Sequence, residues 1–291
     1  MFATLVGALP EPPAGGDLVR SWLAAQLDAG LELLSFEAAR NPDVGLVERW
    51  RRASVIAGEL GAGAVKAAVL GPYSSASGQP IDETVEVTRA VLEALVDAGC
   101  SFVEVHEPAA AGIGEDAGRR GDFRRAHERL VEGMPGHLCL AITGGNADAA
   151  GVETIVVPGY RSYLFDLIAG PDNWRLVTRV PPGAGVVVGA LDPRPGARNT
   201  ADVLVWAAHY AASTGGRGLD RVGLATAGSL GGLGWDEAVE RLRLLGEAAR
   251  IAGLHGEDLG RSLDPRNVDA RSAAMGRYAP ARMRRGGRRP A

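Results

Sequence analysis

The stretch VKAAVLGPYSSASGQPIDETVEVTRAVLEALVDAGCSFVEV, residues 65–105, decides the fold because it contains two expected strands joined by one expected helix. Residues 65–70 and 101–105 are short apolar runs, as in buried strands. Between them, apolar side chains recur at helical spacing at Val85, Val91, Leu92 and Leu95. We expect this helix to be capped by Asp82 and ended by Gly99. A strand, a helix and a strand in this order indicate two parallel strands of one sheet.

The same alternation extends along most of the chain. We expect the other strands at residues 4–7, 31–36, 138–142, 153–157, 185–191 and 221–225. We expect the other helices at residues 17–30, 46–61, 122–131, 201–212 and 235–249, the first capped by Asp17. Residues 159–182 show only weak periodicity. About eight strand–helix units in about 250 residues predict an α/β fold, a single-domain (β/α)8 TIM barrel. A doubly wound open sheet is the alternative, but no Gly-x-Gly-x-x-Gly motif follows the first strand.

Composition places the chain among soluble globular enzymes. Of its 291 residues, 46% are hydrophobic and 23% are charged, which is ordinary for that class. No apolar run is long enough to cross a bilayer, and the first residues lack the basic start of a secretory signal. The two cysteines, Cys100 and Cys139, are too few for a disulfide framework, so we expect a reducing, cytoplasmic location.

Charge is unevenly distributed along the chain. The net charge is −4, yet residues 281–289 hold five arginines. We expect a barrel over residues 1–278 and a basic, disordered tail over residues 279–291. The acidic body argues against nucleic acid as a partner. We expect small-molecule substrates and no membrane partner, and a homo-oligomer is compatible with the sequence. Lys66 is the only lysine, which we attribute to the base composition of the genome.

Candidate functional residues follow from the barrel, whose active site lies at the C-terminal ends of the strands. The polar residues at or just after those ends include Glu37, Arg40, Tyr73, His106, Glu107 and Asp192. Glu104 and His106 share one face of a strand, because they lie two residues apart. His106 can act as a general base, and a structural histidine in the core is the alternative.

A second pair, His137 and Cys139, also lies two residues apart on an expected strand and shares one face. An imidazole beside a thiol is part of what a zinc site needs. The later strand ends offer no further Cys or His as a third or fourth ligand. Cys139 alone would more often be a small buried apolar side chain than a ligand.

Five short segments together resemble the C-terminal catalytic barrel of cobalamin-independent methionine synthase, and the resemblance extends from Leu5 to about Arg250. The segments are VGALP (6–10), LSFEAARN (34–41), GPYS (71–74), VHEPA (105–109) and GHLC (136–139). The most specific is VHEPA, which is similar to the family's Ile-Asp-Glu-Pro-Ala. The resemblance implies that Glu37 binds an amino-acid substrate and that His137 and Cys139 are zinc ligands.

Two zinc ligands of that family are missing here. The third ligand, a Glu before an Arg-Ser pair, corresponds to Pro158 before Arg161 and Ser162. The fourth, a Cys after the last strand, has no counterpart in TAGSL, residues 226–230. Two protein ligands rarely hold zinc tightly, so we expect zinc to be absent or weakly bound.

The resemblance therefore predicts a methyltransferase with an altered acceptor. We expect methyltetrahydrofolate as the donor and an amine, other nitrogen or thiol of a small amino-acid-like molecule as the acceptor, rather than homocysteine. His106 or His137 would be the base, and Asp192 would face the donor. The expected substrate-binding residues are Glu37, Arg40, Tyr73, Glu107 and Arg161. We expect Glu37, His106, His137 and Asp192 to open into one cavity at the C-terminal face.

Two other functions remain open. The first is a lyase or decarboxylase on an acidic small molecule, as in the related uroporphyrinogen decarboxylases. It would need convergent arginines, for which Arg40, Arg161 and Arg194 are the candidates. The second is a binding protein without catalytic activity. Fold alone does not separate these functions.

Overall fold

The computed structural model describes residues 1–13, 15–76, 80–255 and 259. The expected basic tail, residues 279–291, and the residues that precede it from 260 lie outside this range. Within it, no helix combines the length and the apolar character that crossing a membrane requires.

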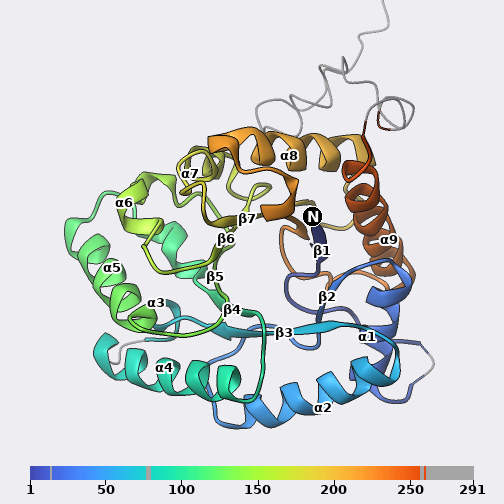
Figure 1. The fold of residues 1–291 in the computed structure, drawn as a ribbon, viewed down its shortest axis with the longest axis horizontal. Helices are drawn as coiled ribbons and strands as arrows, with labels where there is room; N and C mark the ends of the chain where they lie inside the picture. Colours follow the sequence, from blue (N-terminus) through green and yellow to red (C-terminus); the bar gives the residue numbers. More distant parts are fainter. Residues whose placement is uncertain (14, 77–79, 256–258, 260–291) are drawn as a thin grey trace, which may run out of the picture.

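Eight parallel strands close into a barrel in sequence order, which confirms the predicted (β/α)8 fold (Figure 1). The first and last strands close the barrel, because β1 pairs with β8 as well as with β2. The strands are β1 (Phe2–Thr4), β2 (Leu33–Ser35), β3 (Ala64–Leu70), β4 (Val103–His106), β5 (Leu138–Ile142), β6 (Ser162–Asp166), β7 (Gly185–Leu191) and β8 (Val222–Thr226).

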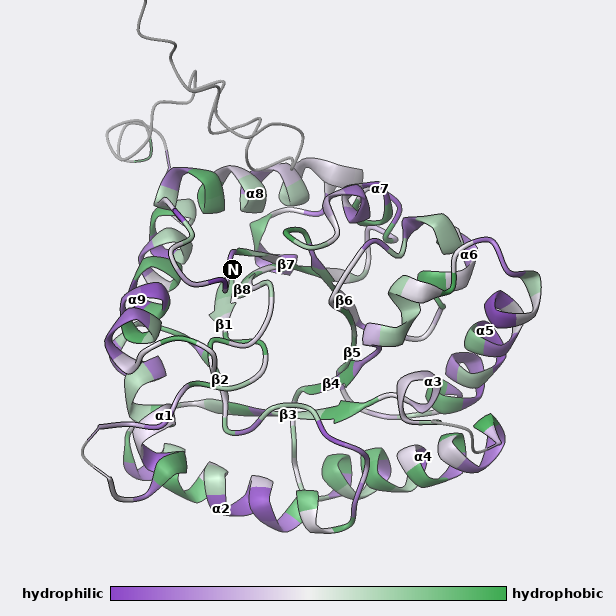
Figure 2. Ribbon diagram, turned by 180° about the vertical axis from the view of Figure 1, so that it is seen from behind, coloured by the Kyte–Doolittle hydropathy of each residue, from purple (hydrophilic) through white to green (hydrophobic). Residues whose placement is uncertain are grey.

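Helices surround the strands and shield them from solvent. They are α1 (Leu18–Asp28), α2 (Gly45–Glu59), α3 (Pro72–Ser75), α4 (Ile81–Asp97), α5 (Ala117–Val131), α6 (Val152–Ile155), α7 (Trp174–Val177), α8 (Ala201–Ser213) and α9 (Trp235–Ala252). Figure 2 shows green, hydrophobic colour along the strands and purple, hydrophilic colour on the outer helices α2, α5 and α9. This separation is expected where one face of each helix packs on the barrel.

Two local predictions are wrong. Residues 153–157 do not form the sixth strand, because α6 occupies Val152–Ile155 and β6 follows at Ser162–Asp166. A short apolar run does not distinguish a buried helical turn from a strand. Asp82 lies inside the first turn of α4, whose N-cap is Pro80. The other predicted cap is confirmed, since the Asp17 side chain accepts hydrogen bonds from the first turn of α1.

The inside of the barrel is apolar at one end and charged further along. A cluster separate from the outer core contains Val6, Leu33, Phe102, Cys139, Ala141, Leu164, Val187 and Ala225. Phe2 packs against this cluster, and its ring lies where a side chain at Gly223 would collide with it, at 2.6 Å. Glu104 and His106 lie on the same face of the chain as Phe102 because of the two-residue period of a strand. They therefore line the barrel interior further along, toward the C-terminal ends of the strands.

Candidate active site

Three polar side chains form a connected chain that runs from the barrel interior to its C-terminal end. Lys66 Nζ of β3 lies 2.5 Å from Glu104 Oε1 of β4, and Glu104 Oε2 lies 2.9 Å from His106 Nε2. The exposed fractions of the three side chains are 0% for Lys66, 1% for Glu104 and 7% for His106. His106 is the last residue of β4. Of the three, it lies furthest toward the C-terminal end of the barrel and is the least buried.

The charged neighbours of Glu104 determine the protonation state of its carboxyl group. Burial alone would raise the pKa of its carboxyl, but the Lys66 ammonium and the His106 hydrogen bond outweigh burial and hold that pKa below its usual value. Glu104 is thus ionised at neutral pH and accepts a hydrogen bond from Nε2–H of His106. In the neutral imidazole the second nitrogen, Nδ1, then carries the lone pair. A carboxylate that orients an imidazole in this way is typical of general acid–base sites.

Glu37, Arg40 and Asp192 lie at the same end of the barrel as His106. The Glu37 carboxylate is held by Arg49 of α2 at 3.0 Å. Asp192 follows β7 and pairs with Arg194 at 2.6 Å. Although burial opposes it, the Arg194 hydrogen bonds lower the pKa of Asp192. Both carboxylates are therefore already paired with arginines.

Arg40 differs from these two carboxylates. Its backbone bridges to Val69 on one side of β3, while His106 pairs with Leu70 on the other side. Two strand spacings separate their backbones, or about 10 Å. Arg40 is exposed, and among the described residues it takes part in no ion pair. It is an available cation at the same end of the barrel as His106.

Glu107 follows His106 at the end of β4 and contacts the neighbouring turn after β3, although we expected it to contact the substrate. Its buried carboxylate accepts hydrogen bonds from the backbone N–H groups of Tyr73 at 3.0 Å and Ser74 at 2.7 Å. His127 Nε2 lies 3.0 Å from the same carboxylate. A side chain at Gly71 would approach it to 2.2 Å, so this turn requires glycine. With full burial and three partners, Glu107 holds the turn after β3 in place and is not free to contact a substrate.

Tyr73 is partly buried beside this turn. Its ring packs edge-on against Phe123 of α5, with the ring centroids 5.4 Å apart. The structure thus places it between α3 and α5, and its contact with a substrate stays a prediction.

His137 and Arg161 lie at the opposite end of the barrel, so the expectation of one shared cavity is wrong. His137 directly precedes β5, and Arg161 directly precedes β6. The C-terminal end of β5 is Ile142, which an extended chain places about 16 Å from His137. The pair His137 and Cys139 was assigned to the correct strand. It lies, however, at the end of that strand that does not usually carry the active site.

The residues around His137 and Cys139 do not fit a zinc ion. His137 Nε2 forms a hydrogen bond of 2.8 Å with Ser162 Oγ. Cys139 is fully buried, and burial together with the Glu104 charge strongly raises the pKa of its thiol. Zinc binds the thiolate, which this environment disfavours. No group of three or more His, Cys, Asp or Glu side chains suited to a metal occurs among the residues that the structure describes.

Sequence reasoning missed two polar residues inside the barrel. Lys66 was attributed to genome composition, although a lysine within an apolar run that forms a buried strand indicates a buried charge. Asp166 was missed because the sixth strand was misplaced. It ends β6 and accepts hydrogen bonds from the backbone N–H groups of Gly144 at 3.0 Å and of Ile168 and Ala169 at 2.9 Å. Asp166 therefore ties the β5 and β6 loops together.

Comparison with known proteins supports the fold. No protein-family model matches the sequence, and no curated protein matches it. A B12-independent methionine synthase from Shewanella sp. W3-18-1, solved with selenomethionine, has a TM-score of 0.65 at 16% identity, covering 86% of this chain and 96% of that one. A methyltransferase from Methanosarcina mazei has a TM-score of 0.57 at 14% identity, covering 80% and 84%. An L-ribulose 3-epimerase has a TM-score of 0.53 at 15% identity, covering 97% and 99%. At these identities the likeness is one of fold.

Proposed function

We propose that this protein is an enzyme whose general base is His106, and that it transfers a methyl group to a nitrogen atom of a small amino-acid-like acceptor. The observation that carries the proposal is the Lys66–Glu104–His106 chain, which ends in an imidazole at the C-terminal end of the barrel. Active sites of (β/α)8 enzymes lie at that end.

The hydrogen-bonded side chains Lys66, Glu104 and His106 supply the proton transfer that such a reaction needs. A protonated amine has no lone pair, so it must lose a proton before it attacks a methyl group. His106 Nδ1 takes that proton, and the imidazolium that forms is stabilised by the Glu104 carboxylate 2.9 Å away. The acceptor nitrogen then forms its bond to the methyl carbon as the bond from that carbon to N5 of the proposed donor breaks. The proton held by His106 passes to N5, so that tetrahydrofolate leaves and the imidazole returns to its neutral state. Lys66 keeps Glu104 ionised throughout. No step requires a metal-bound thiolate, in keeping with a residue set that does not fit zinc.

The charges near His106 favour an acceptor with a carboxylate. Arg40 is exposed and can bind a carboxylate through paired N–H groups. Glu37 is already neutralised by Arg49, which makes it a weaker partner for an ammonium group than the family resemblance implies. We propose methyltetrahydrofolate as the donor, with Asp192 facing it.

The lyase alternative has less support. It needs several arginines that converge on an acidic substrate. Arg161 lies at the other end of the barrel, and Arg194 is paired with Asp192. Only Arg40 of the three candidates remains available at the C-terminal end.

The proposal is tested with methyl-labelled methyltetrahydrofolate and a panel of amino acids and small amines, following the label by mass spectrometry. We expect transfer to a nitrogen-containing acceptor, and a loss of at least about 100-fold in His106→Gln. The control is His255→Gln, which changes an exposed histidine after α9. The proposal fails if no panel member is methylated, or if His106→Gln matches the wild type. Turnover of an acidic substrate without label transfer, lost in His106→Gln, would instead establish the lyase.

A further inference from the structure

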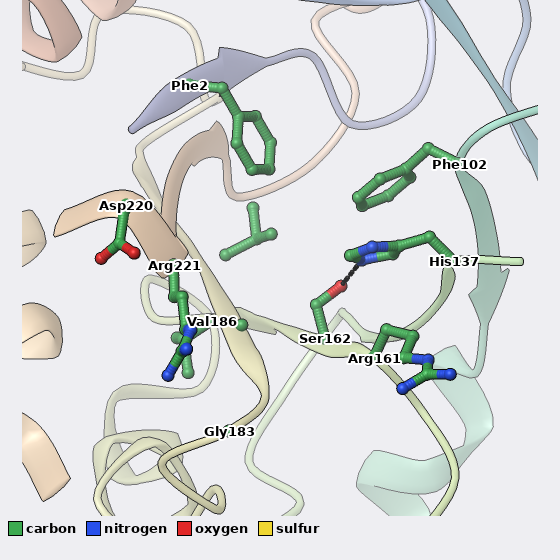
Figure 3. Close-up of a pocket in the computed structure, with 11 residues that line it drawn as sticks. Phe2, Phe102, His137, Arg161, Ser162, Gly183, Val186, Asp220 and Arg221 are labelled. Carbon is green, nitrogen blue, oxygen red and sulfur yellow. Dashed lines mark hydrogen bonds between the residues drawn. The ribbon is translucent and has the colours of Figure 1, made fainter. Parts of the chain in front are cut away.

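A pocket lies at the N-terminal end of the barrel, at the opposite end from His106. Figure 3 shows its residues converging from the starts of several strands. Its volume is about 260 Å³, and its lining includes Phe2, Phe102, His137 and Ser162. Residues at this end of such a barrel usually serve stability alone. A cavity lined by rings and polar side chains therefore requires another explanation.

The walls of the pocket are flat, apolar and fixed in position. The rings of Phe102 and His137 are stacked, with their centroids 4.4 Å apart and an interplanar angle of 21°. Phe2 meets Phe102 edge-on, with centroids 6.1 Å apart. Ser162 holds the His137 ring through a 2.8 Å hydrogen bond. These rings pack on one another and form an apolar wall against which a planar aromatic group can lie.

The rim of the pocket is positively charged. Arg161 and Arg221 both line it, together with a single acidic residue, Asp220. Both arginines are exposed, and neither takes part in an ion pair with any residue of the described chain. Arg221 is oriented by a hydrogen bond that it donates to the Pro182 carbonyl at 3.1 Å. With two arginines and one aspartate in its lining, the pocket has an excess of positive charge for a ligand to meet.

We propose that this pocket is a binding site for a small aromatic carboxylate. The ring lies against Phe2, Phe102 and the stacked His137, and the carboxylate reaches Arg161 or Arg221 at the rim. Guanidinium groups bind carboxylates through paired N–H donors. A compact inorganic anion would leave the apolar walls without a partner, so an aromatic body is favoured over phosphate. The site is separate from the C-terminal end and does not depend on the reaction proposed there.

The test is a titration of the full chain with benzoate, followed by NMR of the His137 imidazole. The chain contains five histidines, so His137→Gln identifies the signal. We expect a saturable shift with a dissociation constant of about 1 mM, within reach of a ligand this small. At least one of the variants Arg161→Gln and Arg221→Gln should weaken binding about tenfold, as expected for loss of a charged hydrogen bond. Both residues are exposed, so these variants should fold.

Three controls make the result decisive. Arg51→Gln changes an exposed arginine of α2, paired with Glu48 at 3.6 Å, and should leave benzoate affinity unchanged. Benzamide has the same shape without the charge, and it should bind at least about tenfold more weakly than benzoate. Inorganic phosphate should not shift the His137 signal. The proposal is overturned if benzoate produces no saturable shift, if benzamide binds equally well, if phosphate binds as tightly as benzoate, or if neither arginine variant weakens binding.

Discussion

His106 and Glu104 are joined by a 2.9 Å hydrogen bond along one face of β4, and only the imidazole of the pair reaches the end of the barrel. This relationship gives the two residues different roles. In the proposed reaction, His106 contacts the substrate, whereas Glu104 acts through His106 as a positioning residue. Lys66, buried on β3, compensates the charge of Glu104.

Glu104→Gln should lower kcat about 100-fold or more while changing KM little. An amide has no charge with which to stabilise the imidazolium, and it no longer fixes which nitrogen carries the proton. Steady-state kinetics on the acceptor identified by the labelling assay measure both constants. A rise in KM with unchanged kcat would mean that Glu104 shapes the binding site instead.

Lys66→Met should destabilise the protein by about 3–5 kcal/mol, because it leaves the Glu104 charge buried without its ammonium partner. The double variant Lys66→Met/Glu104→Met removes both charges and should recover most of this loss. Urea unfolding at neutral pH gives the free energy of unfolding of each protein. A single variant that costs less than about 1 kcal/mol would contradict a strongly coupled buried pair.

The stability of the protein should depend on His137 in mildly acidic solution. Burial, and then the charge of Arg161, lower the pKa of this imidazole in the folded protein. The unfolded chain, with a usual pKa of about 6.5, binds more protons as pH falls through that value. Folding is therefore penalised from about pH 6.5 down to the lower folded pKa.

His137→Gln should remove this penalty. We expect wild type to lose more free energy of unfolding than His137→Gln between about pH 7.5 and pH 5.5. The exposed-histidine variant His255→Gln should follow the wild type. Parallel curves for wild type and His137→Gln would show that His137 has an ordinary pKa in the folded state.

Metal analysis of the purified protein should find no stoichiometric zinc. His137 is bonded to Ser162, and the Cys139 thiol is buried in a setting that raises its pKa. Two such donors do not make a tight site. The opposite outcome is one zinc per chain that is lost in Cys139→Ser.

The sequence was sufficient for the barrel because most strands are clear apolar runs. The limits predicted for β5 and β7 match those observed, since both runs are bounded by glycine or polar residues. The strand β6 was missed because the preceding run, residues 153–157, is equally apolar yet forms the buried turn α6. A short apolar run does not reveal its own backbone conformation.

The candidate site could be predicted only in part. His106 was placed correctly, because a boundary error of one residue leaves it at the end of β4. His137 was assigned to the active-site end although it precedes the predicted strand 138–142, because its similarity to a zinc-ligand motif was given more weight than its place in the chain. Lys66 had no motif at all, and its role emerges only from its contact with Glu104 across two strands.

The central claim is that Glu104 holds His106 with its proton on Nε2 and its lone pair on Nδ1. Long-range 1H–15N NMR spectra of the imidazoles test this directly and need no substrate, with His106→Gln identifying the signal. At a pH where His106 is neutral, we predict the Nε2–H tautomer in wild type and a mixture of tautomers in Glu104→Met. A wild-type signal with the proton on Nδ1, or no change in Glu104→Met, would contradict the account.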